Sequence, residues 1–234
     1  MARLLQVRDL SYAKDKDHNV FSNLHFGVND GDIIVLHGQS GVGKTTLLKC
    51  IAHLNVYAGQ VLYRGQTPKY YGVPLYRTKV FYVPQRPSLL PGTPRDFLAT
   101  VTSFKSRKSR QIAGHSNTSI YPIEVSKAWG IDEELWDRNW SNLSGGESQR
   151  IALATAVGLN TAEVLLLDEP TSALDSHSTA LVERFIYDEL RSAESELKAI
   201  IWITHSEEQG RRVGTRFLHI TPTGCEEEPI LPEF

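Results

Sequence analysis

Residues 38–46 read GQSGVGKTT and follow directly after the apolar run IIVL at residues 33–36. The apolar run predicts a buried strand, and the segment TLLKCIAHL that continues from the turn predicts a helix. Glycine permits backbone angles and close approach that a Cβ atom obstructs, so successive N–H groups of the turn can point at an anion. The N-terminus of the following helix adds a partial positive charge. The stretch therefore predicts a strand, a phosphate-binding turn and a helix.

The turn supplies the candidate phosphate ligands. Lys44 adds a formal positive charge, and the hydroxyl of Thr45 is placed to bind a magnesium ion. The pattern GxxxxGK[ST] can arise by chance, but its position between a strand and a helix favours binding of the β- and γ-phosphates of a nucleotide. The residues predicted to bind the nucleotide here are Gly38, Gln39, Ser40, Gly41, Val42, Gly43, Lys44, Thr45 and Thr46.

A second candidate stretch, EVLLLDEP at residues 163–170, ends a buried strand in two adjacent carboxylates. Parallel sheets place their ligands at the carboxyl ends of the strands. Asp168 is predicted to hold the magnesium ion through water, and Glu169 to orient the attacking water or accept its proton. The alternative is a strand that simply ends in a polar turn. A phosphate loop in the same chain favours the catalytic interpretation.

A third stretch, LSGGESQR at residues 143–150, places a serine hydroxyl and two glycine amides directly before a helical segment. This arrangement predicts a second anion site at Ser144, Gly145 and Gly146. The alternative is an ordinary helix start that Ser144 caps. Two phosphate-binding helix starts about a hundred residues apart predict a nucleotide held between two protomers.

The composition indicates an ordinary globular protein and limits its partners. The 234 residues are 41% hydrophobic, enough for a sizeable core, and carry 25 basic and 27 acidic side chains. That balance lacks the cationic excess of nucleic-acid-binding proteins, so no nucleic-acid partner is expected. The two cysteines predict neither a disulfide scaffold nor a zinc site. We expect no secretory signal and no membrane-spanning segment, because the longest apolar runs have the length of a strand.

The first part of the chain is expected to be rich in β-structure and the middle part helical. Short runs rich in Val, Ile and aromatic residues, such as residues 60–63 and 79–83, predict strands. From about residue 94 to residue 160, segments with helical spacing alternate with polar or glycine-containing breaks, which predicts a helical insert.

The last part of the chain predicts a parallel sheet. Residues 164–167 and 199–203 read as buried strands, and residues 179–197 between them as an amphipathic helix. This alternation is typical of parallel strands joined by helices. The inward-facing residues of the helix are expected to be Leu181, Phe185 and Leu190. The tail from Pro222 onward, with further prolines and three consecutive glutamates, is expected to be loose, solvated surface.

The motifs together resemble those of the ABC ATPase nucleotide-binding domain. GQSGVGKTT, VPQRP, LSGGESQR, VLLLDEPTSALD and ITHS occur in the order and approximate spacing of that family, over nearly the whole chain. The resemblance implies an α/β P-loop NTPase (RecA-like) fold with a parallel-sheet core, an N-terminal antiparallel β subdomain and a helical subdomain carrying the signature. Residues 1–234 would form a single ABC ATPase domain. Its core would comprise residues 1–89 and 161–234, and its helical subdomain residues 90–160.

The resemblance also implies a head-to-tail homodimer around two ATP molecules with Mg²⁺, each held by the loop of one subunit and the LSGGE signature of the other. Gln85 would sense the magnesium and the attacking water, and His205 would contact the γ-phosphate. Tyr12 would stack on the adenine, and Asp175 would contribute to communication across the dimer. Each residue also has a plainer interpretation. Gln85 could be a polar residue after a strand, and His205 a structural histidine. Tyr12 could be a core aromatic, and Asp175 a helix cap.

The site residues that the resemblance implies fall into three groups. The catalytic residues would be Lys44, Gln85, Glu169 and His205. The magnesium ligands would be Thr45, Gln85 and Asp168. The nucleotide-binding residues outside the phosphate loop would be Tyr12, Ser144, Gly145, Gly146, Glu147 and Asp175. Three positions, none of them in the hydrolytic chemistry, depart from the common pattern of the family: Thr155, Glu163 and Ser206.

The leading interpretation is the ATP-binding subunit of a transporter, cytoplasmic and peripheral on the cytoplasmic face of a membrane. Only the 57 residues 86–142 separate the Q-loop glutamine from the signature, too few for the long coiled coil of chromosome-maintenance relatives. The chain would dock on a separate membrane permease through residues 86–104, whereas the basic run at residues 105–110 reads as a solvated loop. The outline resembles ATPases of metal tolerance, notably iron export.

Two other interpretations stay open. One is a soluble ATP-switched module that acts on protein or nucleic-acid assemblies without a membrane partner. The other is a cassette that binds nucleotide without hydrolysing it, which the intact Lys44, Asp168, Glu169 and His205 disfavour.

Overall fold

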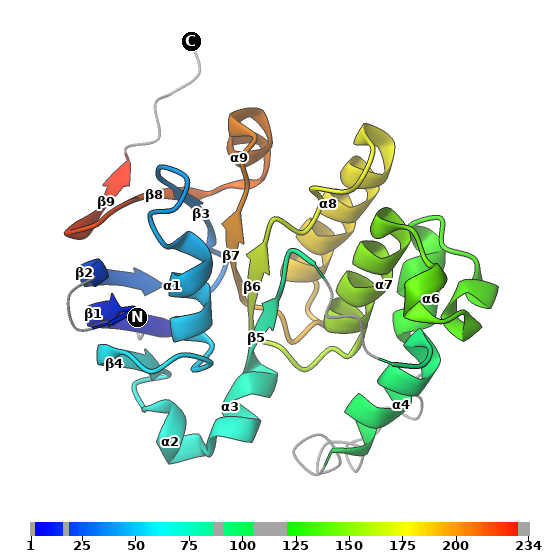
Figure 1. Cartoon of the computed structure of the whole chain (residues 1–234), viewed down its shortest axis with the longest axis horizontal. Helices are drawn as coiled ribbons and strands as arrows, with labels where there is room; N and C mark the ends of the chain where they lie inside the picture. Colours follow the sequence, from blue (N-terminus) through cyan, green and yellow to red (C-terminus); the bar gives the residue numbers. More distant parts are fainter. Residues whose placement is uncertain (1–2, 16–18, 87–90, 105–120, 229–234) are drawn as a thin grey trace. The chain divides into compact units, whose positions relative to one another are not determined.

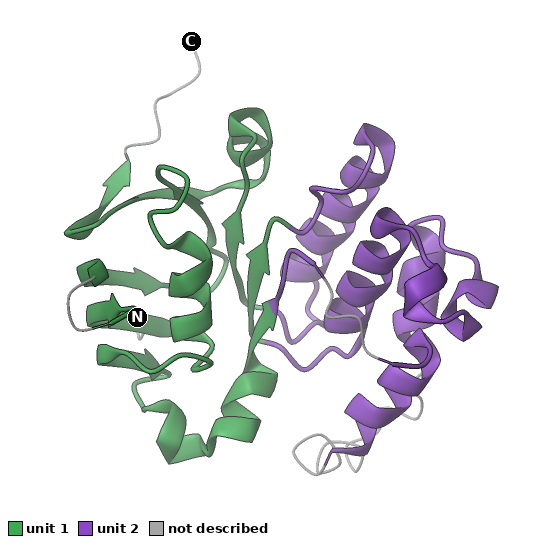
Figure 2. Cartoon of the chain, viewed as in Figure 1, with its two compact units in different colours: residues 1–82, 163–169, 198–234 green, residues 83–162, 170–197 purple. Residues whose placement is uncertain are grey.

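The computed structural model describes residues 3–15, 19–86, 91–104 and 121–228. The chain divides into two compact units, which are coloured separately in Figure 2. The first unit comprises residues 1–82, 163–169 and 198–234, and the second comprises residues 83–162 and 170–197. The division into a core and a helical subdomain at residues 90–160 stays a prediction. The basic run at residues 105–110, and residues 87–90 of the expected docking surface, lie outside the described residues.

One sheet of the first unit is antiparallel, with three strands in the order β2-β1-β4 (Figure 1). Its strands are β1 (Leu5–Ala13), β2 (Asn19–Val28) and β4 (Ala58–Tyr63). Leu5 and Val7 are buried, as alternation requires, but the next buried residue is Leu10. The register shifts between Val7 and Leu10, where Asp9 has a φ of 49°. This irregularity adds one residue and returns the apolar side chains to the buried face.

The other sheet has six strands in the order β5-β6-β7-β3-β8-β9 (Figure 1). Its strands are β3 (Ile33–His37), β5 (Val80–Val83), β6 (Val164–Asp168), β7 (Ala199–Ile203), β8 (Arg216–Thr221) and β9 (Gly224–Glu228). The pairs β6–β7, β7–β3 and β3–β8 are parallel. Every residue of β6 and β7 is buried, which explains their continuous apolar sequence.

The register of the parallel strands brings the candidate residues to one edge of the sheet. Ile203 pairs with Leu36 on one side and with Asp168 on the other. The three strands therefore end at the same level. The phosphate loop follows β3, Glu169 follows β6, and His205 follows β7 within two residues.

The helices in the described part of the first unit are α1 (Lys44–Ile51), α2 (Pro68–Tyr71), α3 (Val73–Lys79) and α9 (Glu207–Val213). Helix α1 buries Leu47, Leu48 and Ile51 in the hydrophobic core that the two sheets of this unit share. This packing holds the N-terminus of α1 at the end of β3.

The second unit is helical, as predicted for the middle of the chain. Among its described residues, the α-helices are α4 (Pro94–Ser103), α6 (Tyr121–Ala128), α7 (Gly145–Gly158) and α8 (Ser176–Arg191), and the short 3₁₀ segments are η2 (Glu133–Asp137) and η3 (Trp140–Asn142). At Gly158 a Cβ atom would lie 2.5 Å from the Cα of Pro122, so the absence of a side chain lets α7 approach α6 closely.

The four tryptophans of the chain are unevenly distributed between the units. Trp202 lies in the middle of the parallel sheet of the first unit, where it pairs with Val35 and Leu167. The other three are Trp129, Trp136 and Trp140 of the second unit. All four are at most 3% exposed. Each is part of the packing of its own unit.

The prediction of a loose tail from Pro222 onward is wrong for the residues up to Glu228. Pro222 and Thr223 form a turn, and residues 224–228 form β9, which pairs antiparallel with β8. Arg216 of β8 explains the difference, because it forms a two-point ion pair with Glu227, with Nε–Oε1 at 2.7 Å and Nη2–Oε2 at 2.8 Å. Cross-strand pairs of opposite charge stabilise a sheet, so the acidic run of β9 is compatible with a hairpin when Arg216 of β8 pairs with it.

The prediction of a helix over residues 179–197 is wrong at both ends and in its buried face. Helix α8 begins at Ser176 and ends at Arg191. The residues it buries are Ser178, Val182, Glu183 and Ile186, whereas Leu181, Phe185 and Leu190 are only half-buried. The prediction followed the large apolar side chains, but the buried stripe follows the spacing of four from Ser178.

In the part of the chain that the structure describes, no helix is long and apolar enough to cross a membrane.

Candidate active site

The phosphate loop runs from the end of β3 to the start of α1. Gly43 is the N-cap of α1 and has a φ of 103°, and Gly38 has a φ of 141°. Both values lie in a region that side chains disfavour. A Cβ atom at Gly38 would lie 2.7 Å from the carbonyl oxygen of Ile220, and one at Gly43 would lie 2.5 Å from Val20 Cγ1. Glycine is therefore required at both ends of the turn.

The ammonium group of Lys44 lies against the loop itself. Its Nζ donates to the carbonyl oxygen of Gly38 at 2.8 Å and to that of Gln39 at 3.1 Å. Burial lowers the pKa of Lys44, while Glu169 and Asp168 act in the opposite direction through their negative charge. The only cation of the loop is thus held against the backbone of the turn, at the carbonyl oxygens of Gly38 and Gln39.

Asp168 accepts a hydrogen bond on each carboxylate oxygen. Thr45 Oγ1 donates to Oδ1 at 3.0 Å, and Tyr82 Oη donates to Oδ2 at 2.8 Å. The side chain of Asp168 comes from the end of β6, and the residue is 3% exposed. Burial raises the pKa of Tyr82 well above its ordinary value, and the hydrogen bond to Asp168 raises it further. The phenol therefore stays protonated and acts as the donor.

Glu169 points toward the end of the neighbouring strand. Its backbone has a φ of 49° and its N–H donates to the carbonyl oxygen of Ile203 at 3.0 Å. One carboxylate oxygen lies 2.7 Å from Nε2 of His205, whose side chain is 62% exposed. A left-handed conformation is costly for a residue with a side chain and is found at functional sites. Here it turns the carboxylate from the line of β6 toward His205.

These side chains suit a magnesium ion bound together with a nucleotide. Thr45 and Asp168 supply hydroxyl and carboxylate oxygens, which are the hard ligands that Mg²⁺ prefers. Within the described residues no group of three or more His, Cys, Asp or Glu side chains could hold a metal ion alone. Mg²⁺ is usually bound through one or two carboxylates together with phosphate oxygens and water, so this small ligand set fits it.

The signature stretch lies in the second unit and forms the start of α7. The Oγ of Ser144 accepts the N–H of Glu147 at 3.2 Å, and the carboxylate of Glu147 accepts the N–H of Ser144 at 2.7 Å. Hydrogen bonding of the Glu147 carboxylate to the backbone N–H of Ser144, and to the side chain of Ser144, lowers the pKa of Glu147. The arrangement is a capping box, so Ser144 caps α7, while its role toward a phosphate group stays a prediction. Gly145 and Gly146 form the first turn of the helix.

A family model of the ABC transporter matches residues 21–172, more than half of the chain. The chain belongs to the ABC transporter family.

Curated ABC relatives match most of the chain. A probable iron export ATP-binding protein of Escherichia coli, FetA, is 30% identical over 88% of this chain and 86% of its own length. A putative ABC transporter ATP-binding protein of Bacillus subtilis, YjkB, is 31% identical over 87% and 76% respectively. A phosphate import ATP-binding protein of Aliivibrio fischeri, PstB 2, is 30% identical over 87% and 74%. The prediction that the chain is an ABC ATPase is confirmed.

Solved ABC structures share the fold. The ATP-binding subunit of an ABC transporter superposes with a TM-score of 0.83 at 21% identity, over 97% of this chain and 90% of the other. A dimeric ATP-binding cassette bound to ADP and phosphate superposes with a TM-score of 0.78 at 22% identity, over 98% and 100%. The predicted P-loop fold, with its parallel-sheet core and antiparallel β subdomain, is confirmed.

The remaining predicted residues of the ABC motifs are spread over both units. Tyr12 lies half-buried in β1 of the first unit, with its ring centroid 6.2 Å from that of Phe21. In the second unit Gln85 is exposed, and Asp175 caps α8 through the N–H of Ser178 at 2.9 Å. The roles of these residues toward a nucleotide stay predictions.

Sequence reasoning missed two residues, one beside the motifs and one within the LSGGESQR stretch. Tyr82 contacts Asp168, as described above. Gln149 of α7 donates from Nε2 to the carbonyl oxygen of Gln85 at 3.1 Å and accepts the N–H of Ala173 at 3.0 Å. It therefore joins the Q-loop, the signature helix and the segment before α8 within the second unit. The available signal was a glutamine two residues after the LSGGE motif, which the structure shows to be buried.

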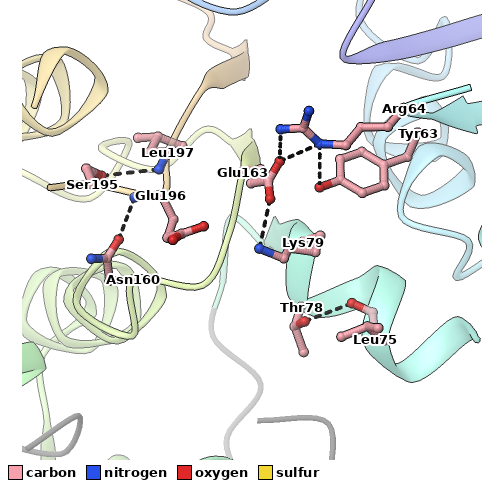
Figure 3. A network of polar contacts seen from close by, with 10 residues as sticks. All are labelled: Tyr63, Arg64, Leu75, Thr78, Lys79, Asn160, Glu163, Ser195, Glu196 and Leu197. Atoms are coloured by element: carbon pink, nitrogen blue, oxygen red, sulfur yellow. Dashed lines mark hydrogen bonds and ion pairs between the residues drawn. The ribbon is translucent and has the colours of Figure 1, made fainter. Parts of the chain in front are cut away.

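The three departures from the ABC pattern have local structural roles. Glu163 receives Arg64 Nε at 2.9 Å and Lys79 Nζ at 2.8 Å, in the network of Figure 3. This ion cluster ties the end of β4 and the end of α3 to the start of β6. Thr155 donates to the carbonyl oxygen of Ile151 within α7, and Ser206 caps α9.

Proposed function

We propose that the chain binds and hydrolyses MgATP at the edge of its parallel sheet. The observation that carries this proposal is the presence of Lys44, Thr45, Asp168, Glu169 and His205 at adjoining strand ends of the first unit. Phosphate needs cationic and N–H donors, magnesium needs oxygen ligands, and hydrolysis needs a base near an attacking water. This edge of the sheet supplies all three.

Each residue has a distinct role in this proposal. The loop residues 38–46 and Lys44 hold the phosphates, and Thr45 and Asp168 hold the Mg²⁺, which would neutralise the charge of the phosphates. Glu169 orients the water and accepts its proton, and His205 holds Glu169 or the γ-phosphate. Gln85 would complete the magnesium site, and Tyr12 would stack on the adenine. General-base catalysis of this kind contributes roughly 10²- to 10⁴-fold to the rate.

The test is phosphate release by the wild-type protein and by Glu169→Gln. The amide keeps the size and one acceptor of the carboxylate but cannot take the proton. We expect turnover to fall by about a hundredfold or more, while binding of a fluorescent ATP analogue with Mg²⁺ persists. Normal turnover by Glu169→Gln would contradict the assigned mechanism. Absence of nucleotide binding in the wild-type protein would contradict the whole proposal.

We propose further that two chains enclose two nucleotides, with Ser144, Gly145, Gly146 and Glu147 of one chain facing the phosphate loop of the other. Asp175 would lie at the same interface. The dimeric cassette among the solved structures, which contains ADP and phosphate, supports this arrangement. Light scattering of the Glu169→Gln protein tests it, because the dimer is expected with MgATP and the monomer without nucleotide. A monomer under both conditions would contradict it.

As a third element, we propose that the dimer drives a separate membrane permease from the cytoplasmic face of the membrane. The family and the transporter names of the relatives support this proposal. Affinity purification of the Glu169→Gln protein from gently solubilised native membranes with MgATP provides the test. We expect a stoichiometric polytopic membrane protein. Recovery of soluble partners alone would favour an ATP-switched module that works without a membrane.

For the cargo we propose a metal ion, namely iron, moved outward. The support is the relative named for iron export. The relative named for phosphate import has the same identity, so phosphate is measured in parallel. Cells that lack the chain are expected to retain more iron after loading and to grow poorly in excess iron, with unchanged phosphate uptake. A loss of phosphate uptake instead would replace export of iron by import of phosphate.

A further inference from the structure

Tyr82 lies beside the carboxylate that is proposed to hold magnesium, and no motif in the chain accounts for it. It belongs to β5, which neighbours β6 in the six-stranded sheet, and both Tyr82 and Asp168 are part of the first unit. Its ring packs against the hydrophobic core of that unit. Its hydroxyl reaches Oδ2 of Asp168 at 2.8 Å. The apolar part of the side chain is thus fixed while its polar end touches the site.

The two hydroxyl groups on Asp168 define the orientation of its carboxylate. Thr45 donates to Oδ1 and Tyr82 donates to Oδ2, so each oxygen has a donor from a different element. Hydrogen bonds to a charged carboxylate are among the stronger ones in proteins. One donor alone would leave the carboxylate free to turn about its last bond. Two donors on opposite oxygens fix that rotation.

The two donors differ in what a bound magnesium ion would require of them. Thr45 is itself proposed to be a ligand, so its oxygen must face the ion as well as Asp168. Tyr82 is not proposed to coordinate the ion, and its ring packs against the hydrophobic core. The contact of Tyr82 with Oδ2 can therefore persist when the ion binds. A phenylalanine would fill the same space in the core, so packing alone gives no reason for the hydroxyl.

We propose that Tyr82 is a positioning residue, which orients Asp168 so that the protein binds the nucleotide together with magnesium more tightly than the nucleotide alone. This inference rests on the proposed function. Groups that hydrogen-bond to metal ligands hold them in the binding orientation, and their loss typically lowers metal affinity by about ten- to a hundredfold. Tyr82 would be such a group for Asp168.

The experiment measures binding of a fluorescent ATP analogue without turnover, once with Mg²⁺ and once with EDTA. The dissociation constant in EDTA divided by that with Mg²⁺ reports how much the ion contributes to nucleotide affinity. We expect Tyr82→Phe to lower this ratio by about tenfold, while affinity in EDTA stays as in the wild-type protein. Tyr71→Phe is the matched control, because it removes another half-buried hydroxyl of the same unit, which donates to the carbonyl oxygen of Tyr63 at 3.2 Å.

The outcomes separate this inference from the function on which it rests. An unchanged ratio in Tyr82→Phe, with the wild-type protein showing clear magnesium dependence, would overturn the inference alone. A wild-type protein without magnesium dependence would overturn the proposed magnesium site itself. An equal loss of affinity with Mg²⁺ and with EDTA would show a merely structural role and would also overturn the inference. Binding in EDTA also verifies folding, and Tyr82→Met offers the same test if Tyr82→Phe does not fold.

Discussion

Nε2 of His205 lies 2.7 Å from a carboxylate oxygen of Glu169, and the two residues follow neighbouring parallel strands. Glu169 is mostly buried, with 15% of its side chain exposed, whereas 62% of the His205 side chain is exposed. The histidine therefore contributes little to the packing. Its contact with Glu169 is the observed feature that links it to the proposed hydrolysis.

His205→Ala is expected to lower the rate of phosphate release by about a hundredfold, because Glu169 loses the partner that orients it. Thermal stability should change little, since an exposed side chain is removed. The matched control is His25→Ala, which removes an exposed histidine with its own carboxylate partner, Asp9, at 3.0 Å. Equal rates for the wild-type protein and His205→Ala would assign the pair a structural role only.

Lys44→Ala is expected to weaken nucleotide binding by about ten- to a hundredfold, the value of one or two charge-assisted hydrogen bonds. In the structure the ammonium group donates to the carbonyl oxygens of Gly38 and Gln39, so it must exchange these partners for phosphate oxygens. Titration with a fluorescent ATP analogue gives the affinity. Lys49→Ala, in the last turn of the same helix, should bind as the wild-type protein does.

Ser144→Ala and Ser144→Asp distinguish the observed role of Ser144 as a helix cap from its proposed role in binding a phosphate group. The alanine variant loses the cap of α7, which typically costs about 1 kcal/mol, whereas aspartate is a good cap. Aspartate at this position would repel a phosphate group, so Ser144→Asp should unfold like the wild-type protein but release little phosphate. Denaturation curves and phosphate release are measured on both variants. Wild-type phosphate release by Ser144→Asp would contradict a role of Ser144 in binding phosphate and would leave helix capping as its only role.

Glu163→Gln is expected to lower the free energy of unfolding by about 2 kcal/mol. Breaking a buried ion pair usually costs about 3–5 kcal/mol, but the amide still accepts one hydrogen bond and the Arg64 side chain is half-exposed. Urea denaturation gives the value. Glu207→Gln, whose 82% exposed side chain pairs with Arg211, should change stability by less than about 0.5 kcal/mol. Equal stability of the two variants would show that the ion cluster contributes nothing.

The stability that Glu163 provides should depend on pH. Burial alone would raise the pKa of Glu163, but hydrogen bonds from Lys79, Tyr63 and Arg64 outweigh it and lower the pKa to about 2. A carboxyl group whose pKa is lower in the folded state stabilises fully above its unfolded pKa near 4.5 and loses this effect as the pH falls toward 2. The stability difference between wild-type protein and Glu163→Gln should therefore shrink from pH 6 toward pH 3. A constant difference would contradict the lowered pKa.

The fold could be predicted where local pattern and tertiary environment agree. The continuous apolar runs of β6 and β7 have one explanation, strands buried on both faces, and both were predicted within one residue. The acidic strand β9 could not be predicted from its own residues. Its three glutamates are explained only by the pairing with β8, where Arg216 binds Glu227. Helix α8 was misjudged because small and polar residues, Ser178 and Glu183, occupy its buried face.

The candidate site shows the same limit. Lys44, Thr45, Asp168 and Glu169 belong to contiguous motifs with a fixed chemistry, so sequence spacing was enough to find them. Tyr82 is 86 positions from Asp168 along the chain. Only the pairing of their strands brings them together, and a tyrosine in a short strand has no local feature that distinguishes it from a core residue. Such long-range partners require the three-dimensional structure.

The uneven distribution of tryptophan makes the two units optically distinguishable. Trp202 is the sole tryptophan of the first unit, and Trp129, Trp136 and Trp140 all report on the second. In a Trp202→Phe protein the intrinsic fluorescence would come from the helical unit alone. The difference between this fluorescence and that of the wild-type protein would report on the six-stranded sheet of the first unit, which contains Trp202. Denaturation and nucleotide titration followed in this way could tell whether the units unfold or respond together, without any attached dye.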